Sequence, residues 1–302
     1  MKAAALLLAA LTAVMQAPRF RTGVDAVRVD ALVVDGRRPV AGLTAQDFEL
    51  WDSGVPQTLE SIAVADVPIR MMVALDTSQS VSGGTLEQLK RGVLAAIAAL
   101  QPPDRAALIT FSSDVRLRSD WNGDADALRR AVTDLRGAGG TSLWDAVFAA
   151  LAFPDETPTV RRLVLVFSDG DDTSSWLPRN SVLDKARRTD GVVYAVQIES
   201  RLPPPGRRLH YRSGIELSKN DRPAWIETPF LDELADITGG ATYMATDAGE
   251  LRDAFARILT EFRTRYLITY VPQGVDTKGW HPIEVKLKNK KGKVTARRGY
   301  LR

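Results

Sequence analysis

Near-continuous hydrophobic runs alternate with amphipathic stretches through the middle of the chain, from Ile69 to about residue 265. Each run is short enough to be a strand, and an unbroken apolar run is typical of a central parallel strand that is covered on both faces. Four runs have this character: 71–75, 106–111, 163–167 and 192–198. The pattern predicts a doubly wound α/β domain, with a mostly parallel sheet and helices on both faces.

The amphipathic stretches predict helices between these strands. In the first, apolar residues recur every three or four positions up to about Leu100, so one helix face should pack on the sheet. Thr85, with Gln88 three residues later, is expected to cap the start of this helix. Further helices are predicted at 125–135, 142–151 and 178–189, and a last one from about Asp247 to Phe262.

Segments with the alternation typical of strands flank the α/β domain on both sides. Val27 and Val29 alternate with polar neighbours before it, as do Ile283, Val285 and Leu287 after it. Because two or three strands are only marginally stable alone, we expect both segments to form one small β module, with the α/β domain inserted between its halves. The predicted divisions are a signal peptide (1–17), an N-terminal β segment (18–66), the α/β domain (67–265) and a C-terminal β segment (266–302).

The start of the chain has the pattern of an export signal, because Lys2 precedes the apolar stretch 3–14. This predicts an exported protein, periplasmic or secreted and in some association with the cell envelope. No later segment has the roughly 20 apolar residues of a transmembrane helix. The 40 basic and 37 acidic residues nearly balance, which argues against nucleic acid as the main partner. The absence of cysteine excludes disulfides, thiolate metal sites and cysteine nucleophiles.

Polar side chains directly follow two of the apolar runs. Asp76, Ser78 and Ser80 come after the first, and Asp169 comes after the third. Ligands of an open α/β sheet bind outside the carboxyl ends of its strands, so the two carboxylates should share one crevice if these strands are neighbours. There they would repel each other unless a proton or a cation lay between them. Thr141, in a Gly-Gly-Thr-Ser turn, can add a further hydroxyl. Such hard oxygen donors suit magnesium, calcium or manganese.

The Asp-x-Ser-x-Ser stretch, the Gly-Gly-Thr-Ser turn and Ser-Asp-Gly at 168–170 together resemble the metal-ion-dependent adhesion site (MIDAS) of von Willebrand factor A domains, over residues 67–265. The resemblance implies a Rossmann-type fold that binds Mg²⁺, or Mn²⁺ or Ca²⁺. It implies that an aspartate or glutamate of a protein partner completes the coordination shell, and that rearrangement at the ion can move the last helix. The implied metal ligands are Asp76, Ser78, Ser80, Thr141 and Asp169.

Residues 40–48 and 52–57 resemble the N-terminal segment of bacterial exported proteins of acidobacterial type that carry a VWA domain. The chain departs from the common VWA pattern at Gln79, where glycine is usual, and at Val81, where methionine often stands. We therefore expect the Gln79 side chain to lie beside the ion and to affect its affinity.

These features favour a non-enzymatic module for extracytoplasmic protein binding, in adhesion or scaffolding. A metal-dependent hydrolase stays open as an alternative because a cation can activate water, although the nearby sequence supplies no general base. A structural envelope protein with an empty site is the third possibility. The sequence identifies neither the partner nor the oligomeric state.

Three further expectations concern the histidines, a long loop and an acidic run. His210 and His281 are expected at the surface, and residues 201–229 in a long surface loop. The acidic run 169–172 could form a second cation loop, but a solvated turn in which only Asp169 is engaged is favoured. The run lacks the spacing of a twelve-residue calcium loop.

Overall fold

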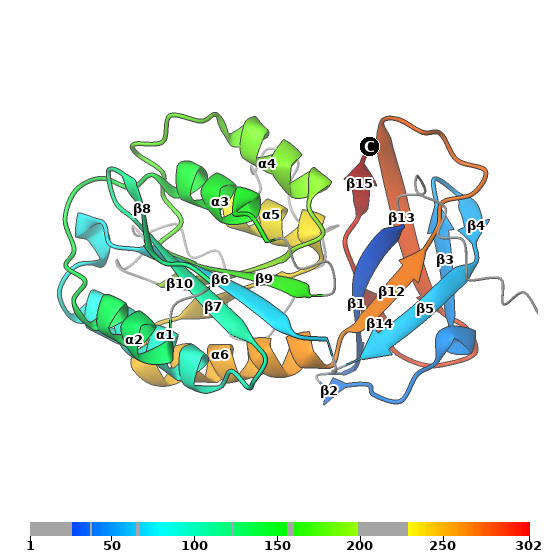
Figure 1. Ribbon diagram of the computed structural model, residues 1–302, viewed down its shortest axis with the longest axis horizontal. Coiled ribbons are helices and arrows are strands. Elements are labelled where there is room, and N and C mark those ends of the chain that lie inside the picture. The colour runs from blue at the N-terminus through cyan, green and yellow to red at the C-terminus, as the bar shows by residue number, and fades with distance from the viewer. Residues whose placement is uncertain (1–25, 37, 65–66, 122–123, 156–159, 199–228) are drawn as a thin grey trace, which may run out of the picture.

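The computed structural model describes residues 26–36, 38–64, 67–121, 124–155, 160–198 and 229–302. The predicted signal peptide, His210 and residues 201–228 of the predicted loop lie outside this part of the chain. The described chain forms an α/β domain beside a smaller β module (Figure 1). None of the helices described has the length and hydropathy that a membrane span requires.

The α/β domain is built on a six-stranded sheet in the order β11-β10-β9-β6-β7-β8. Neighbouring strands are parallel from β11 to β7, and β8 is antiparallel to β7, so the sheet is mixed rather than parallel throughout. Its strands are β6 (Ile69–Asp76), β7 (Arg105–Phe111), β8 (Val115–Ser119), β9 (Arg161–Ser168), β10 (Val192–Ile198) and β11 (Ala241–Ala245). The four apolar runs are the four inner strands, and the edge strands β8 and β11 were not predicted.

Helices cover both faces of this sheet (Figure 1). One layer holds α1 (Gly84–Ala98), α2 (Ala125–Thr133) and α6 (Ala248–Arg263). The other holds α3 (Leu143–Ala152), α4 (Arg179–Arg188) and α5 (Phe230–Thr238). Strand residues alternate between the two layers, since Val73 packs with the first and Ala74 with the second. Burial on both sides therefore explains why the sequence of these strands shows no polar alternation.

Two details of the helices differ from the sequence prediction. Helix α1 begins at Gly84 with Gly83 as its N-cap, so the prediction that Thr85 caps it is wrong. Gly83 has φ +67°, a conformation that glycine adopts without steric cost. Because a positive φ is not helical, the helix cannot extend beyond Gly83 toward the N-terminus. Helix α5 was not predicted, although Gly239 ends it with φ +77°, a common helix-terminating signal.

The β module contains strands from both ends of the chain. In one sheet, β1 pairs antiparallel with β12 and β14, and β12 pairs with β5. In the other, β13 lies between β15 and β3, and β4 pairs with β3. The bounds are β1 (Val27–Asp35), β2 (Arg38–Pro39), β3 (Phe48–Asp52), β4 (Val55–Gln57), β5 (Leu59–Val64), β12 (Tyr266–Tyr270), β13 (Trp280–Leu287), β14 (Lys293–Thr295) and β15 (Gly299–Leu301). A short 3-10 turn, η1 (Ala45–Asp47), precedes β3.

The expectation that His281 lies at the surface is wrong. His281 is buried in the β module, and its Nδ1 lies 3.2 Å from Oδ1 of the fully buried Asp52. The alternation of β13 explains this, because His281 shares the inward face of the strand with Ile283. Asp52 also accepts hydrogen bonds from the hydroxyls of Tyr270 at 2.9 Å and Tyr300 at 2.8 Å. One carboxylate of β3 thus joins three strands that come from the end of the chain.

The β module meets the α/β domain near the first residues of the central strands. Arg161, which opens β9, forms a buried ion pair with Asp30 of β1. Arg265 is fully buried and donates hydrogen bonds to the Tyr194 hydroxyl at 2.8 Å and to the Asp30 carbonyl at 3.1 Å. Because the module lies at the amino ends of these strands, their carboxyl ends face away from it.

Candidate metal centre

The first part of the candidate site is the turn that follows β6. Asp76 ends the strand, and its fully buried carboxylate accepts a hydrogen bond through Oδ1 from the backbone N–H of Ser78 at 2.8 Å. The hydroxyls of Ser78 and Ser80 lie 3.0 Å apart, with Ser78 buried and Ser80 exposed. The chain here forms a 3-10 turn, η2 (Gln79–Val81), shortly before Gly83, the N-cap of α1. Three of the predicted ligands therefore lie within one short turn.

The second part follows β9, the parallel neighbour of β6. Because Leu75 pairs with Phe167, the next residues of both strands, Asp76 and Ser168, lie side by side. Ser168 Oγ donates a hydrogen bond to Asp76 Oδ2 at 2.8 Å. Asp169 comes next and is partly exposed. The two carboxylates predicted to share a crevice thus belong to adjacent strand ends.

The third part is the turn that carries Thr141, which is buried. The backbone N–H of Gln79 donates to the Gly139 carbonyl at 3.0 Å, which ties this turn to the first. The Thr141 carbonyl accepts hydrogen bonds from the backbone N–H groups of Thr173 at 2.8 Å and Ser174 at 3.0 Å, which ties the turn to the segment after β9. The five predicted ligands therefore lie on three loops that contact one another at the carboxyl edge of the sheet.

The glycines before Thr141 allow the loops to approach each other. Gly139 has φ +87°, and a Cβ added at Gly140 would lie 2.2 Å from Ser174 Oγ. A side chain would therefore be strained at position 139, and one at position 140 would displace the Ser174 side chain of the loop after β9. Their predicted role, close approach of the backbone to an ion, stays a prediction. Gln79 is exposed, and its expected place beside an ion is likewise untested.

A pair of aspartates joins the loop after β9 to the first turn of α3; we call this pair the aspartate clasp. Asp172 Oδ1 accepts a hydrogen bond from the backbone N–H of Trp144 at 3.1 Å. In return, the Asp145 carboxylate accepts hydrogen bonds from the backbone N–H groups of Trp176 and Leu177, both at 2.9 Å. The expectation that only Asp169 is engaged in the acidic run is therefore wrong, because Asp172 caps a helix start.

Electrostatics make this edge unfavourable for two carboxylates without a cation. Burial, with a smaller contribution from the nearby charge of Asp169, raises the pKa of Asp76 to about 6, although hydrogen bonds from Ser78 and Ser168 act to lower it. Within the residues that the structure describes, no lysine or arginine forms an ion pair with Asp76. The buried carboxylate therefore lacks a positive counterpart among these residues.

The donor atoms at this edge fit a hard divalent cation. They are two carboxylates and three hydroxyls, which suit Mg²⁺, Mn²⁺ or Ca²⁺. Ser142, next to Thr141, buries its hydroxyl without a hydrogen-bond partner among the described residues. Among all the residues that the structure describes, there is no cluster of three or more His, Cys, Asp or Glu residues that could hold a metal. An ion at this edge would thus depend on hydroxyl oxygens as well as on Asp76 and Asp169.

Comparison with known protein families shows that residues 71–171 match the model described as von Willebrand factor type A domain. The chain contains a von Willebrand factor type A domain. The matched segment begins within β6, ends at Asp171 and includes all five predicted ligands. The likeness of the flanking segments to exported proteins of acidobacterial type stays a prediction.

Several solved structures are similar to this chain. BatB from Bacteroides thetaiotaomicron has 16% identity and a TM-score of 0.48, over 64% of this chain and 98% of that one. A von Willebrand factor type A protein from Catenulispora acidiphila has 12% identity and a TM-score of 0.49, over 92% and 73%. Proximal thread matrix protein 1 from the mussel byssus, whose MIDAS motif is occupied by zinc, has 13% identity and a TM-score of 0.49, over 70% and 49%. No curated protein matches the chain.

Three features of this VWA domain were missed by the sequence analysis. Ser168 stands in the Ser-Asp-Gly motif and Ser142 in the glycine-rich turn, but no role was predicted for either. The order of residues in these motifs was the available signal for both. The aspartate clasp had no such signal, because it depends on how a loop folds back onto α3.

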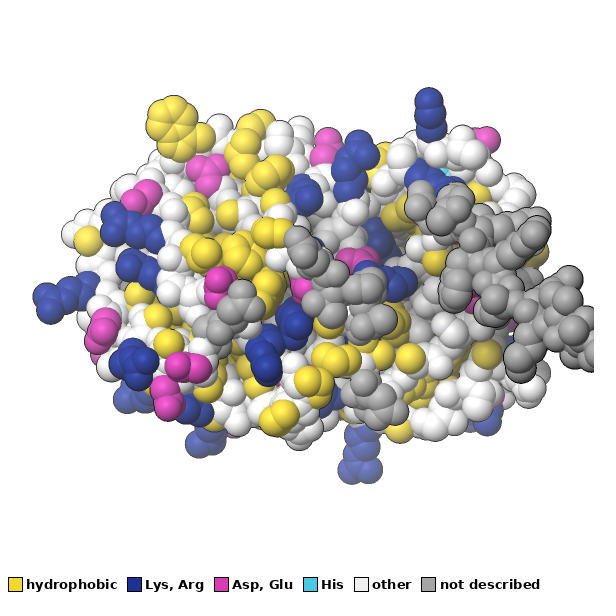
Figure 2. Space-filling view, in the orientation of Figure 1, with side chains coloured by type: hydrophobic (Ala, Val, Ile, Leu, Met, Phe, Trp, Pro, Cys, Tyr) yellow, Lys and Arg dark blue, Asp and Glu magenta, His cyan; other side chains and the backbone are white. Residues whose placement is uncertain are grey.

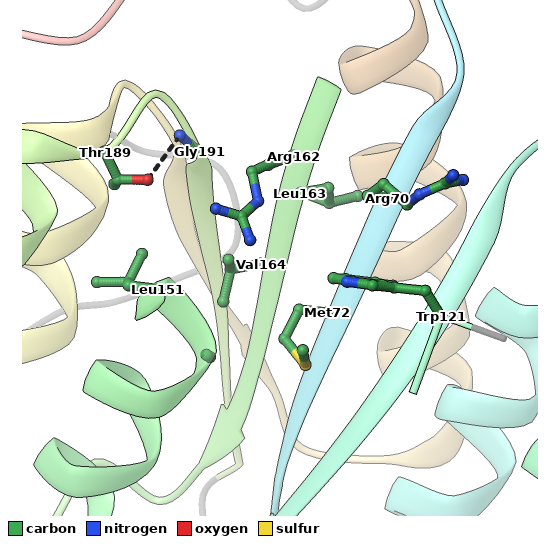
Figure 3. A pocket seen from close by; sticks show the side chains of 10 residues that line it. Arg70, Met72, Trp121, Leu151, Arg162, Leu163, Val164, Thr189 and Gly191 are labelled. Atoms are coloured by element: carbon green, nitrogen blue, oxygen red, sulfur yellow. Dashed lines mark hydrogen bonds between the residues drawn. The ribbon is translucent and has the colours of Figure 1, made fainter. Parts of the chain in front are cut away.

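A cavity at the other end of the VWA sheet is separate from the candidate metal centre. It is lined by residues at the amino ends of β6 and β9, including Arg70 and Arg162, together with Trp121 (Figure 3). Its volume of about 10 Å³ is about enough for one water molecule. The cavity is therefore too small to hold a substrate or a cofactor.

Proposed function

We propose that this protein is a non-catalytic binding module. It captures an aspartate or glutamate side chain of a partner protein on a divalent ion. The ion, Mg²⁺ or else Mn²⁺ or Ca²⁺, is held by the five predicted ligands: Asp76, Ser78, Ser80, Thr141 and Asp169. One observation carries the proposal: the buried Asp76 carboxylate, with its raised pKa, lies next to Asp169 and has no cationic partner among the described residues. A divalent ion would supply the missing positive charge.

When bound, the ion would offer an electrophilic position that an incoming carboxylate can occupy. The chain's own residues prepare this position. Ser168 and the Ser78 backbone fix both oxygens of Asp76, and the aspartate clasp fixes the loop that carries Asp169. The site faces away from the β module, so the module does not cover this edge. The arrangement therefore suits recognition of a protein.

We place this activity outside the cytoplasm, in the periplasm or in the secreted fraction, where it would serve adhesion or scaffolding. The support is the export-signal pattern of residues 1–17. A metal-dependent hydrolase is the alternative with a distinct chemistry. The candidate site provides no histidine base among the described residues, because His281 lies in the β module. This favours binding over hydrolysis.

Calorimetric titration of the protein without its predicted signal peptide tests the proposal. We expect Mg²⁺ or Mn²⁺ to bind the wild type, and Asp76→Ala and Asp169→Ala to abolish binding while circular dichroism shows an intact fold. Asp253→Ala is a matched control, because Asp253 is exposed on α6. Absence of heat at millimolar ion in the folded wild type would favour a structural protein with an empty site. Turnover of phosphate esters or peptides that disappears in Asp169→Ala would favour the hydrolase.

A further inference from the structure

An exposed aromatic side chain lies close to the candidate metal centre. Trp176 is 90% exposed, more than any other large hydrophobic residue in the described part of the chain. Helix α3 lies beside it and carries Asp145 as its one charged residue. Its Trp144 and Phe148, one turn apart, pack against the core with one side and are partly exposed on the other. Figure 2 shows hydrophobic side chains gathered over the region of α3. We call Trp144, Phe148 and Trp176 the aromatic surface.

The loop that carries Trp176 is held in place. Its backbone N–H donates to Asp145 Oδ2 at 2.9 Å, and the following N–H, of Leu177, donates to Asp145 Oδ1. The Ser175 hydroxyl donates to Asp172 Oδ1 at 2.6 Å and accepts a hydrogen bond from the Asp145 backbone N–H at 3.1 Å. Because the backbone is already fixed, only the two side-chain torsions of Trp176 remain to be ordered on binding. Trp176 is therefore prepared as a contact residue.

The aromatic surface lies within a few residues of the predicted metal ligands. The Ser174 N–H donates to the carbonyl of Thr141 at 3.0 Å, and Trp176 is two positions further along the chain. Two residues of extended chain span about 7 Å at most, so a short segment of a partner can reach both Trp176 and the ion. One bound segment can thus engage both features.

The net charge that a partner meets at this edge depends on whether the ion is bound. The charged residues in the segment 169–177 are Asp169, Asp171 and Asp172, all acidic. Without an ion, this loop repels a carboxylate, and the ion reverses the local charge that an approaching acid meets. The acidic loop and the adjacent aromatic side chains are therefore complementary to a segment that is acidic at one position and apolar at another.

We propose that the aromatic surface binds an apolar side chain of the same partner segment whose carboxylate coordinates the ion. The segment is extended, with leucine, isoleucine or phenylalanine two to four residues from an aspartate or glutamate, because an extended chain rises about 3.3 Å per residue. This inference rests on the proposed function, since the ion must recruit the acid. The apolar contact would make binding depend on the sequence of the partner segment, which coordination of a carboxylate alone does not do.

Synthetic peptides displayed on a biosensor surface test the inference. The probe peptides are Gly-Leu-Gly-Gly-Asp-Gly, its reverse spacing Gly-Asp-Gly-Gly-Leu-Gly, and Gly-Gly-Gly-Gly-Asp-Gly as the apolar-free control. With Mg²⁺ present, we expect at least one leucine peptide to bind the wild type about tenfold more tightly than the control peptide. Trp176→Ala should remove this gain without changing Mg²⁺ affinity in calorimetry, and Trp176→Phe should keep part of it. Trp280→Ala, at an exposed tryptophan of the β module, should leave the gain intact.

The outcomes separate this inference from the proposed function. Magnesium-dependent binding of all three peptides with equal affinity overturns the inference and leaves the proposed function standing. The inference is also overturned if Trp176→Ala retains the leucine gain. If the folded wild type shows no magnesium-dependent binding of any of the three peptides, both the inference and the proposed function are overturned.

Discussion

Ser168 and Asp76 are 92 positions apart in the chain, yet Ser168 Oγ donates a hydrogen bond to Asp76 Oδ2 at 2.8 Å. The contact follows from the pairing of β6 with β9, which places the last residues of both strands side by side. The other oxygen of Asp76 is held by the Ser78 backbone N–H. Both carboxylate oxygens are thus oriented by the protein itself, as is typical of metal ligands supported by neighbouring hydrogen bonds.

Ser168→Ala should therefore weaken Mg²⁺ binding without removing a predicted ligand. Loss of a supporting hydrogen bond typically lowers metal affinity by about 10- to 100-fold, and we expect a decrease in this range by calorimetry. Ser119→Ala, at the end of the edge strand β8, is the matched control and should bind Mg²⁺ as the wild type does. Unchanged affinity in Ser168→Ala would show that Asp76 needs no such support.

The raised pKa of Asp76 predicts how the stability of the ion-free protein depends on pH. The folded state holds this proton more tightly than the unfolded chain, so the contribution to stability is complete below about pH 4 and is lost as pH rises through about 6. Between the ordinary value of 3.8 and about 6, the shift corresponds to about 3 kcal/mol. Asp76→Asn, which is neutral at every pH, should lack this loss.

Urea unfolding in EDTA at about pH 4 and about pH 8 measures this effect as the difference between the wild type and Asp76→Asn, which cancels the other titrating groups. We expect the variant to gain stability relative to the wild type at pH 8. Saturating Mg²⁺ should stabilise the wild type at pH 8 and leave Asp76→Asn nearly unchanged. Parallel pH profiles for the two proteins in EDTA would contradict the prediction.

The aspartate clasp predicts that two residues outside the ligand set control the site. Asp172→Ala leaves the Trp144 N–H at the start of α3 without its acceptor, at a cost of about 1 kcal/mol, and frees the loop after Asp169. We expect faster amide hydrogen exchange in residues 169–177 and a weaker affinity for Mg²⁺. Asp172→Asn keeps an acceptor oxygen and should restore much of both. Asp171→Ala, at the exposed neighbouring position, is the control, and equal effects from Asp171→Ala would disprove a specific clasp.

The close contact at Gly140 predicts a steric effect on the same site. In Gly140→Ala, the new Cβ would lie 2.2 Å from Ser174 Oγ and 3.1 Å from Thr173 Oγ1, so these two side chains must shift, at a cost of about 1 kcal/mol. Thermal unfolding should show the loss, and Mg²⁺ affinity should fall with it. Gly84→Ala, where a Cβ meets nothing within 4 Å, should be neutral or stabilising. If Gly140→Ala and Gly84→Ala have the same stability and Mg²⁺ affinity, the contact with Ser174 does not constrain position 140.

The inner strands of the VWA sheet could be predicted from sequence because burial on both faces leaves an unbroken apolar run, as in 163–167. The edge strands could not, since β8 has exposed residues and lacks such a run. His281 was misplaced because its burial follows from the two-residue period of β13, in register with β3. In both cases, the missing information was the identity of the neighbouring strand.

The candidate site shows the same limit. Asp76, Thr141 and Asp169 could be chosen from short motifs because each follows or precedes a recognisable element. The hydrogen bond from Ser168 to Asp76 requires knowledge that β6 and β9 are neighbours in register. The aspartate clasp requires the path of a loop, which no local pattern encodes. The predicted metal ligands can thus be chosen from local sequence motifs, whereas the hydrogen bonds that orient them depend on the three-dimensional fold.

The Asp52 network predicts that the stability of the β module can be changed without affecting the metal site. Asp52→Ala removes the acceptor of the Tyr270 and Tyr300 hydroxyls and the partner of His281, all in buried surroundings. Burial and the Asp52 charge raise the pKa of Tyr300 to about 12, so the hydroxyl stays a donor at neutral pH.

Orphaned buried donors of this kind typically cost about 3 to 5 kcal/mol, and we expect a loss of this size in urea unfolding of Asp52→Ala. Glu284→Ala, at an exposed position of β13, should cause little change. The candidate metal centre lies at the carboxyl ends of the central strands, whereas the β module lies at their amino ends. Mg²⁺ affinity of the folded Asp52→Ala protein should therefore equal that of the wild type. A parallel loss of Mg²⁺ affinity would instead show that the β module and the metal centre are energetically coupled.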